Sequence, residues 1–96
     1  MAAYMLIAAK IEDRDKFRAQ YASAAAALVA ERGGKYIVLG PGAELLEGTL
    51  DGYTSVAVSE WPDRETALAF WNSPEYAEIK KGREGLAEVQ VLLAGE

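Results

Sequence analysis

The residues best suited to chemistry lie between Trp61 and Gly85, where aromatic and polar side chains occur close together. Tyr76 and Arg83 are seven residues apart, so a helix would place them on one face. There a phenol and a guanidinium could bind the carboxylate of a small molecule. They could equally lie over the protein core or contact a partner chain, and the sequence leaves these alternatives open.

Four further residues are candidates for ligand binding. Tyr36 and Trp71 could line a cavity, although a tryptophan is more often part of a core or an interface. Glu47 is the best candidate for a buried functional carboxylate, with a solvated carboxylate at a strand edge as the alternative. Asn72 precedes Ser73-Pro74-Glu75, and helix capping by this motif explains most of it without a ligand.

The composition removes the commonest catalytic groups. The chain has no histidine and no cysteine, which excludes thiolate chemistry, the usual general base and the commonest metal ligand. Proton transfer would therefore depend on Glu47 or Tyr76. The acidic residues lack the spacing of a calcium loop, and no glycine-rich phosphate loop or nucleophile elbow occurs. We expect no metal and no cofactor, and the sequence identifies no catalytic residue.

Length and charge limit the remaining functions. The 96 residues suit one domain, residues 1–96, and a domain of this size buries roughly 60–65% of its unfolded surface. A net charge of −5 with scattered basic residues argues against binding nucleic acid. There is no apolar run of about 18 residues and no signal-like segment, so we expect a cytoplasmic protein that does not bind a membrane.

A long amphipathic helix is predicted from Asp13, its N-cap, to about residue 32, where Gly33-Gly34 ends it. Its two faces differ in polarity. The inward face is expected to carry Phe17, Tyr21, Ala24 and Leu28. The outward face is expected to carry Arg14, Arg18, Glu31 and Arg32.

Four strands are predicted at residues 4–11, 35–39, 53–61 and 88–94. In the second strand, alternation places Tyr36 and Val38 opposite to Ile37 and Leu39. This strand is expected to resume at residues 43–47 after Gly40-Pro41-Gly42. Because proline cannot donate to a ladder, the strand lies at an edge of the sheet or carries a bulge there.

A kinked pair of helices is expected between the third and fourth strands. Asp63 can cap the first helix, Ser73 can cap the second with Pro74 at its first position, and Gly85 is the expected stop. The order β-α-β-β-α-β predicts an α+β, ferredoxin-like domain. Its four-stranded antiparallel sheet carries both helical layers on one face.

The helices can cover only one face of this sheet, yet the strand at residues 4–11 is apolar on both sides. A second apolar face would exceed the few hundred Å² that monomers usually expose. We therefore expect a homodimer that packs sheet against sheet. A moderately apolar face in contact with solvent is the alternative.

Two stretches resemble a known family. FWNSPEYAEIKKGREG, preceded by EWP, and the earlier ELLEG are similar to the family called domain of unknown function 1330, within the dimeric α+β barrel group. The similarity extends from Tyr4 to Ala94. It implies a ferredoxin-like protomer whose sheet meets that of a second copy to make a barrel, with a small-molecule cavity between sheet and helices. It implies no activity.

Two functions remain open, and the sequence does not decide whether the protein is an enzyme. The first is the binding or conversion of a small organic acid or aromatic compound without a cofactor. The cavity would be lined by Tyr36, Glu47, Trp71, Asn72, Tyr76 and Arg83. The second is a structural or regulatory homodimer whose cleft is filled by its own side chains.

Overall fold

The computed structural model describes residues 2–40 and 42–95. Its four strands are β1 (Ala3–Ile11), β2 (Lys35–Gly40), β3 (Ser55–Trp61) and β4 (Ala87–Gly95). A first helical layer consists of α1 (Arg14–Phe17), the π-helical segment η1 (Arg18–Ala22) and α2 (Ser23–Glu31). A second consists of α3 (Arg64–Trp71), α4 (Pro74–Lys80) and the short 3₁₀ segment η2 (Lys81–Arg83).

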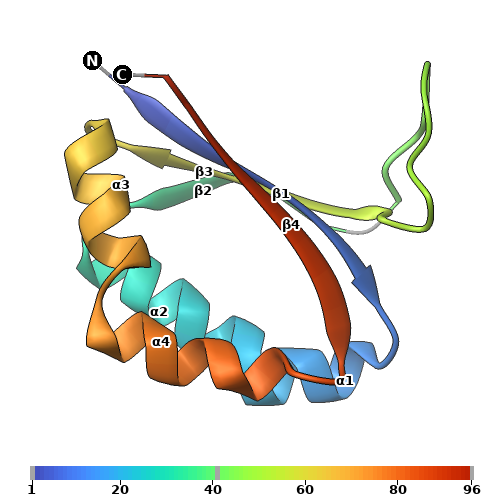
Figure 1. Cartoon of the computed structure of the whole chain (residues 1–96), viewed down its shortest axis with the longest axis horizontal. Coiled ribbons are helices and arrows are strands. Elements are labelled where there is room, and N and C mark those ends of the chain that lie inside the picture. Colours follow the sequence, from blue (N-terminus) through green and yellow to red (C-terminus); the bar gives the residue numbers. More distant parts are fainter. Residues whose placement is uncertain (1, 41, 96) are drawn as a thin grey trace.

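The strands form one antiparallel sheet in the order β2-β3-β1-β4, with both helical layers on one face (Figure 1). The ferredoxin-like prediction is therefore confirmed, as is the edge position of β2. Within the described residues no helix is long and apolar enough to cross a membrane.

The predicted helix caps are confirmed. The side chains of Asp13, Asp63 and Ser73 accept hydrogen bonds from the backbone N–H groups of Lys16, Thr66 and Tyr76. The bond from Thr66 also lowers the pKa of the Asp63 carboxyl, because it stabilises the charged form. These caps fix the residues at which α1, α3 and α4 begin.

The core lies between the sheet and the helices, and its centre is Trp61, which is 1% exposed. The Trp61 ring packs against Phe70 with centroids 5.0 Å apart, and Phe70 in turn packs against Tyr76 at 4.7 Å. Gly34 lies under the same tryptophan, where a Cβ would come within 2.7 Å of the ring. A side chain larger than hydrogen at residue 34 would therefore displace the central core residue.

The predicted alternation in β2 is wrong because the strand carries a bulge. Tyr36 pairs with Ser59 and Val38 with Val58, so Ile37 is an extra residue between them. The bulge returns Leu39 to the helix side of the sheet, where it lines the same cavity as Tyr36. The bulge therefore lies earlier than the Gly40-Pro41-Gly42 turn, of which Pro41 lies outside the described residues.

The inward face of the first helical layer is confirmed at Leu28 but differs from the prediction at Ala24. Ala25, Leu28 and Val29 are buried, whereas Ala24 is exposed. The π-helical segment η1 precedes these residues, and a π turn takes in more residues than an α turn, so Ala25 rather than Ala24 reaches the core side. Gly33 has φ +97° and ends the layer as expected.

The strand predicted at residues 43–47 is absent. In the chain described here this stretch belongs to the connection between β2 and β3 and pairs with no other strand. The connection projects beyond the ends of β2 and β3 and turns to the side of the sheet that the helices leave uncovered (Figure 1).

The face of the sheet opposite the helices, called here the open face, carries an apolar row across all four strands. Val38 pairs with Val58, Val58 with Leu6, and Leu6 with Leu92. Cross-strand partners lie on the same face, so the four side chains are neighbours. Polar residues lie on both sides of the row along the strands, because Tyr4 donates to Glu60 on one side, and Lys10 and Glu88 lie 3.7 Å apart on the other.

Candidate functional site

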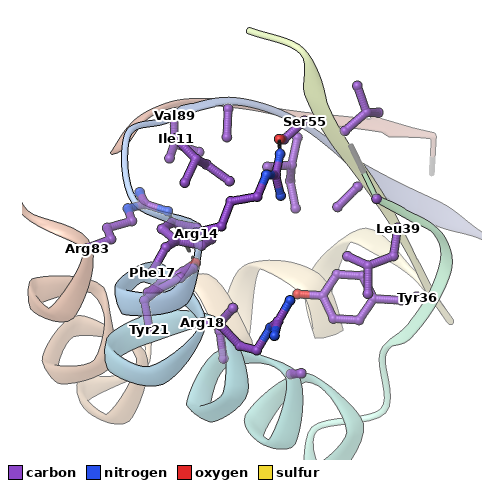
Figure 2. A pocket seen from close by; sticks show the side chains of 18 residues that line it. Ile11, Arg14, Phe17, Arg18, Tyr21, Tyr36, Leu39, Ser55, Arg83 and Val89 are labelled. Atoms are coloured by element: carbon purple, nitrogen blue, oxygen red, sulfur yellow. Dashed lines mark hydrogen bonds between the residues drawn. The ribbon is translucent and has the colours of Figure 1, made fainter. Parts of the chain in front are cut away.

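The main cavity has a volume of about 270 Å³ and lies between the sheet and the first helical layer. Strands β1, β3 and β4 supply aliphatic side chains, and Phe17, Ala22 and Ala25 supply the facing wall. The polar lining groups are Arg14, Arg18, Tyr21, Tyr36, Ser55 and Arg83 (Figure 2). Among the described residues that line the cavity, none is acidic.

The three arginines come from two sides of the cavity. Arg14 and Arg18 lie one turn apart on the first helical layer, and Arg83 enters from η2 (Figure 2). Arg14 donates to the hydroxyl of Ser55, and the Arg18 side chain is directed toward the hydroxyl of Tyr36 (Figure 2).

Among the described residues, no carboxylate lies within ion-pair distance of these three guanidinium groups. Within residues 2–40 and 42–95, none of Arg14, Arg18 and Arg83 forms an ion pair, although Arg32 does so with Glu75 at 2.9 Å. Like charges one helical turn apart repel each other. The cavity is therefore a positively charged site within a chain of net charge −5.

Arg83 is held in place by two phenols. Its Nη1 donates to the hydroxyl of Tyr21 at 3.2 Å and to that of Tyr76 at 3.4 Å, and the two hydroxyls are 2.6 Å apart. Its guanidinium also lies 5.1 Å from the centre of the Tyr21 ring. These contacts restrict the guanidinium to one orientation at the cavity wall.

Tyr36 and Tyr76 both have a raised pKa and remain protonated at neutral pH. Burial raises the pKa of Tyr36 to about 12, with a smaller contribution from Tyr21. Burial is also the main reason for the raised pKa of Tyr76, and the nearby Arg83 only partly opposes the effect. Neither phenol is therefore suited to act as a general base, and both can donate hydrogen bonds.

A close backbone approach positions this cluster. A Cβ on Gly82 would collide with the carbonyl oxygen of Gln20 in η1, so only glycine allows η2 to lie against the π-helical segment. Arg83 follows Gly82, and Tyr21 follows Gln20. This contact therefore sets the separation between the two chain segments that carry the guanidinium and its phenol partner.

The structure separates the six predicted ligand-binding residues. Tyr36 and Arg83 line the main cavity, whereas Tyr76 does not. Of the two residues that the helical spacing singled out, Arg83 therefore lies at the cavity wall and Tyr76 lies beside it. A second cavity of about 20 Å³ is lined by Tyr36, Trp71, Tyr76 and Arg83. That volume admits about one water molecule, so the protein fills this space with its own side chains.

The two remaining candidates lie elsewhere. Asn72 is the exposed C-cap of α3 and lines neither cavity. Glu47 is exposed in the connection between β2 and β3, so its predicted burial is wrong and the solvated alternative applies. No described buried side-chain nitrogen or oxygen lacks a hydrogen-bond partner, so a ligand would meet polar groups that water also reaches.

The sequence analysis missed Arg14 and Arg18, which it assigned to the outward face. Both are exposed, as that assignment requires, and they line the cavity as well, because a long side chain can border a pocket while its charge stays in water. A signal was present, since Arg14, Phe17, Arg18 and Tyr21 follow helical spacing along one stripe.

Within residues 2–40 and 42–95, no group of three or more acidic side chains could hold a metal ion. Figure 2 shows instead a wall of guanidinium, phenol and aliphatic groups. Such groups suit a ligand with a negative charge and an apolar body.

Comparisons with known proteins agree with this architecture. The model of a family described as domain of unknown function (DUF1330) matches residues 2–96. A dimeric ferredoxin-like protein of unknown function from Jannaschia sp. CCS1 is 14% identical, with a TM-score of 0.76 over 100% of both chains. No curated protein matched the sequence.

Two further solved structures have the same fold. A protein of unknown function from Rhodopseudomonas palustris is 19% identical, with a TM-score of 0.75 over 99% of this chain and 82% of that one. SnoaB, a cofactor-independent oxygenase from Streptomyces nogalater, is 14% identical, with a TM-score of 0.72 over 99% of this chain and 92% of that one. At these identities the likeness concerns the fold alone.

Proposed function

This chain belongs to the family described as domain of unknown function (DUF1330), and we propose that it binds a small organic acid with an apolar or aromatic body, without a cofactor. One observation carries the proposal: three arginines without ion-pair partners among the described residues border a cavity whose other lining residues are aliphatic or aromatic except for Gly40 and Ser55. An organic anion would neutralise them while its body contacts the aliphatic wall.

The cavity volume limits the size of the ligand. About 270 Å³ corresponds to roughly nine water molecules at ~30 Å³ each, which suits a ligand with one or two rings. The alternative, a cleft filled by the protein's own side chains, applies to the small cavity beside Trp71. The main cavity is large enough for a ligand and therefore supports binding.

Binding is better supported than proton abstraction. The cavity has no histidine, cysteine or carboxylate among its described lining residues, and the raised pKa of Tyr36 keeps that phenol neutral. A conversion is the second candidate, favoured by the fold shared with SnoaB. It would have to start from the reactivity of the bound acid itself. The expected cytoplasmic location remains a prediction.

Calorimetric titration with a panel of aromatic and aliphatic carboxylates, each compared with its neutral amide, tests the proposal. We expect at least one acid to bind and its amide to bind roughly tenfold more weakly, because an ion-paired hydrogen bond is lost. Arg18→Gln should weaken binding of the acid by a similar factor.

Lys16→Gln is the matched control. It removes the same charge from an exposed position on the same helical layer that does not line the cavity, and should leave the affinity unchanged. If no acid binds, or if both variants weaken binding equally, the arginine cavity is not the binding site.

We also propose that the protein is a homodimer joined through the open face. The apolar row Val38, Val58, Leu6 and Leu92, with polar residues on both sides of it along the strands, has the arrangement of an interface core and its rim. The fold shared with the dimeric Jannaschia protein supports the same assembly. Light scattering at micromolar concentration should give twice the mass of the chain, and Leu92→Glu should give the single mass.

A further inference from the structure

The connection between β2 and β3, residues 42–54, is called here the arm. Leu46 is 88% exposed, and Leu45 is exposed beside it. Ala43 donates to the Thr54 carbonyl at 3.1 Å at the base of the arm. Within the described part of the chain, no backbone hydrogen bond joins residues 44–49 to any other segment.

Contacts of Tyr53 hold the base of the arm on the side of the open face. The hydroxyl of Tyr53 donates to Glu88 at 3.2 Å, and the ammonium of Lys10 lies 5.2 Å from the centre of the Tyr53 ring. Lys10 and Glu88 are cross-strand partners at the end of the open face. From this anchor the arm continues away from the helices (Figure 1), so it does not cover the cavity.

The sequence of the arm is typical of a segment that packs against another protein surface. Its pattern at residues 43–47 predicts a strand, and two adjacent leucines in solvent are costly unless another surface covers them. Within the described chain no surface covers Leu46, which is 88% exposed.

The area that a stable dimer buries points to the same partner. A stable interface takes ~800 Å² of accessible surface from each partner. The arm adjoins the open face and adds the exposed Leu45 and Leu46 to the apolar surface that a second copy can bury.

We propose that the arm of each protomer lies along the sheet of a second copy of this chain, with Leu46 against the apolar row that contains Leu92. The inference rests on the proposed homodimer and goes beyond it by assigning an exchanged segment. In this arrangement the backbone at residues 43–47 becomes extended and gains hydrogen bonds from an edge of the partner sheet, which completes the strand that the sequence predicts.

The absence of cysteine makes a direct test possible. A Leu46→Cys/Leu92→Cys variant should form a covalent dimer under mild oxidation, seen on a non-reducing gel. Leu46→Cys/Leu68→Cys is the matched control, because Leu68 is an equally replaceable exposed leucine on α3, at the helix side of the molecule. It should cross-link at least tenfold more slowly.

Light scattering on the same samples separates the two proposals. A dimer in which Leu46 and Leu92 do not cross-link faster than the control pair overturns the arm exchange and leaves the homodimer intact. A single-chain mass overturns both. In a Leu45→Ser/Leu46→Ser variant, which alters only exposed side chains, the dimer dissociation constant should rise on the order of tenfold. An unchanged constant also contradicts the exchange.

Discussion

The hydroxyl groups of Tyr21 and Tyr76 lie 2.6 Å apart, although 55 residues separate them in the sequence. One belongs to the π-helical segment and the other to α4, so this bond joins the two helical layers beside the cavity. Arg83 donates to both hydroxyl groups, so the tyrosine pair holds the guanidinium of Arg83 in position.

Removing one hydroxyl tests this support. In Tyr76→Phe, Tyr21 and Arg83 each lose a partner while the ring packing against Phe70 remains. We expect a loss of about 1 kcal/mol in the free energy of unfolding and severalfold weaker binding of the organic acid, with no change for a neutral amide. Urea unfolding and calorimetry measure the two effects. Ser23→Ala removes an exposed hydroxyl that does not line the cavity as a control and should not change ligand affinity.

The pH dependence of stability follows from the buried phenols. Tyr36 has a pKa of about 12 in the folded chain and 10.0 as its ordinary value, so the unfolded chain loses this proton first as the pH rises. Its contribution is complete below pH 10 and is lost between pH 10 and about 12. Tyr76, whose pKa is also raised, acts in the same direction. Urea unfolding across this range should show the decline, and Tyr36→Phe should make it shallower.

The contact at Gly82 gives a third prediction. Gly82→Ala should force η2 away from Gln20, because the added methyl group meets a backbone oxygen that cannot rotate aside. We expect a loss of about 1–3 kcal/mol in stability and a severalfold loss in acid affinity, since Arg83 moves with η2. Glu84→Ala, at the exposed neighbouring position, should change neither quantity. Full affinity in Gly82→Ala would show that the close approach does not position the guanidinium.

The Asn72-Ser73 pair separates capping from ligand binding. The Ser73 hydroxyl is buried, donates to the Phe70 carbonyl at 2.8 Å and accepts from the Tyr76 N–H at 3.1 Å. Ser73→Ala should cost about 1–2 kcal/mol of stability. Asn72→Ala, at an exposed position, should stay within about 0.5 kcal/mol and leave acid affinity unchanged. A marked loss of affinity in Asn72→Ala would restore this residue as a ligand contact.

Local signals in the sequence predicted the order of elements, because caps such as Asp63 and Ser73 act on the first turn that follows them. They could not locate the bulge at Ile37 or the π-helical segment at Arg18–Ala22. Both depend on how strands and helices fit together rather than on neighbouring residues. Arg18 is exposed, as expected, but its place at the cavity could not be predicted, since a long charged side chain can border a cavity and remain hydrated.

The arm also has a consequence for the cavity. Its two ends continue into Leu39 and Gly40 on one side and Ser55 on the other, and all three line the space between sheet and helices. A surface that fixes the arm therefore also restricts the rim of that space. By thermodynamic linkage, if dimerisation raises the affinity for the acid by some factor, binding of the acid raises the affinity of dimerisation by the same factor. Occupancy of the two sites would then be cooperative, with protein concentration acting as an effector.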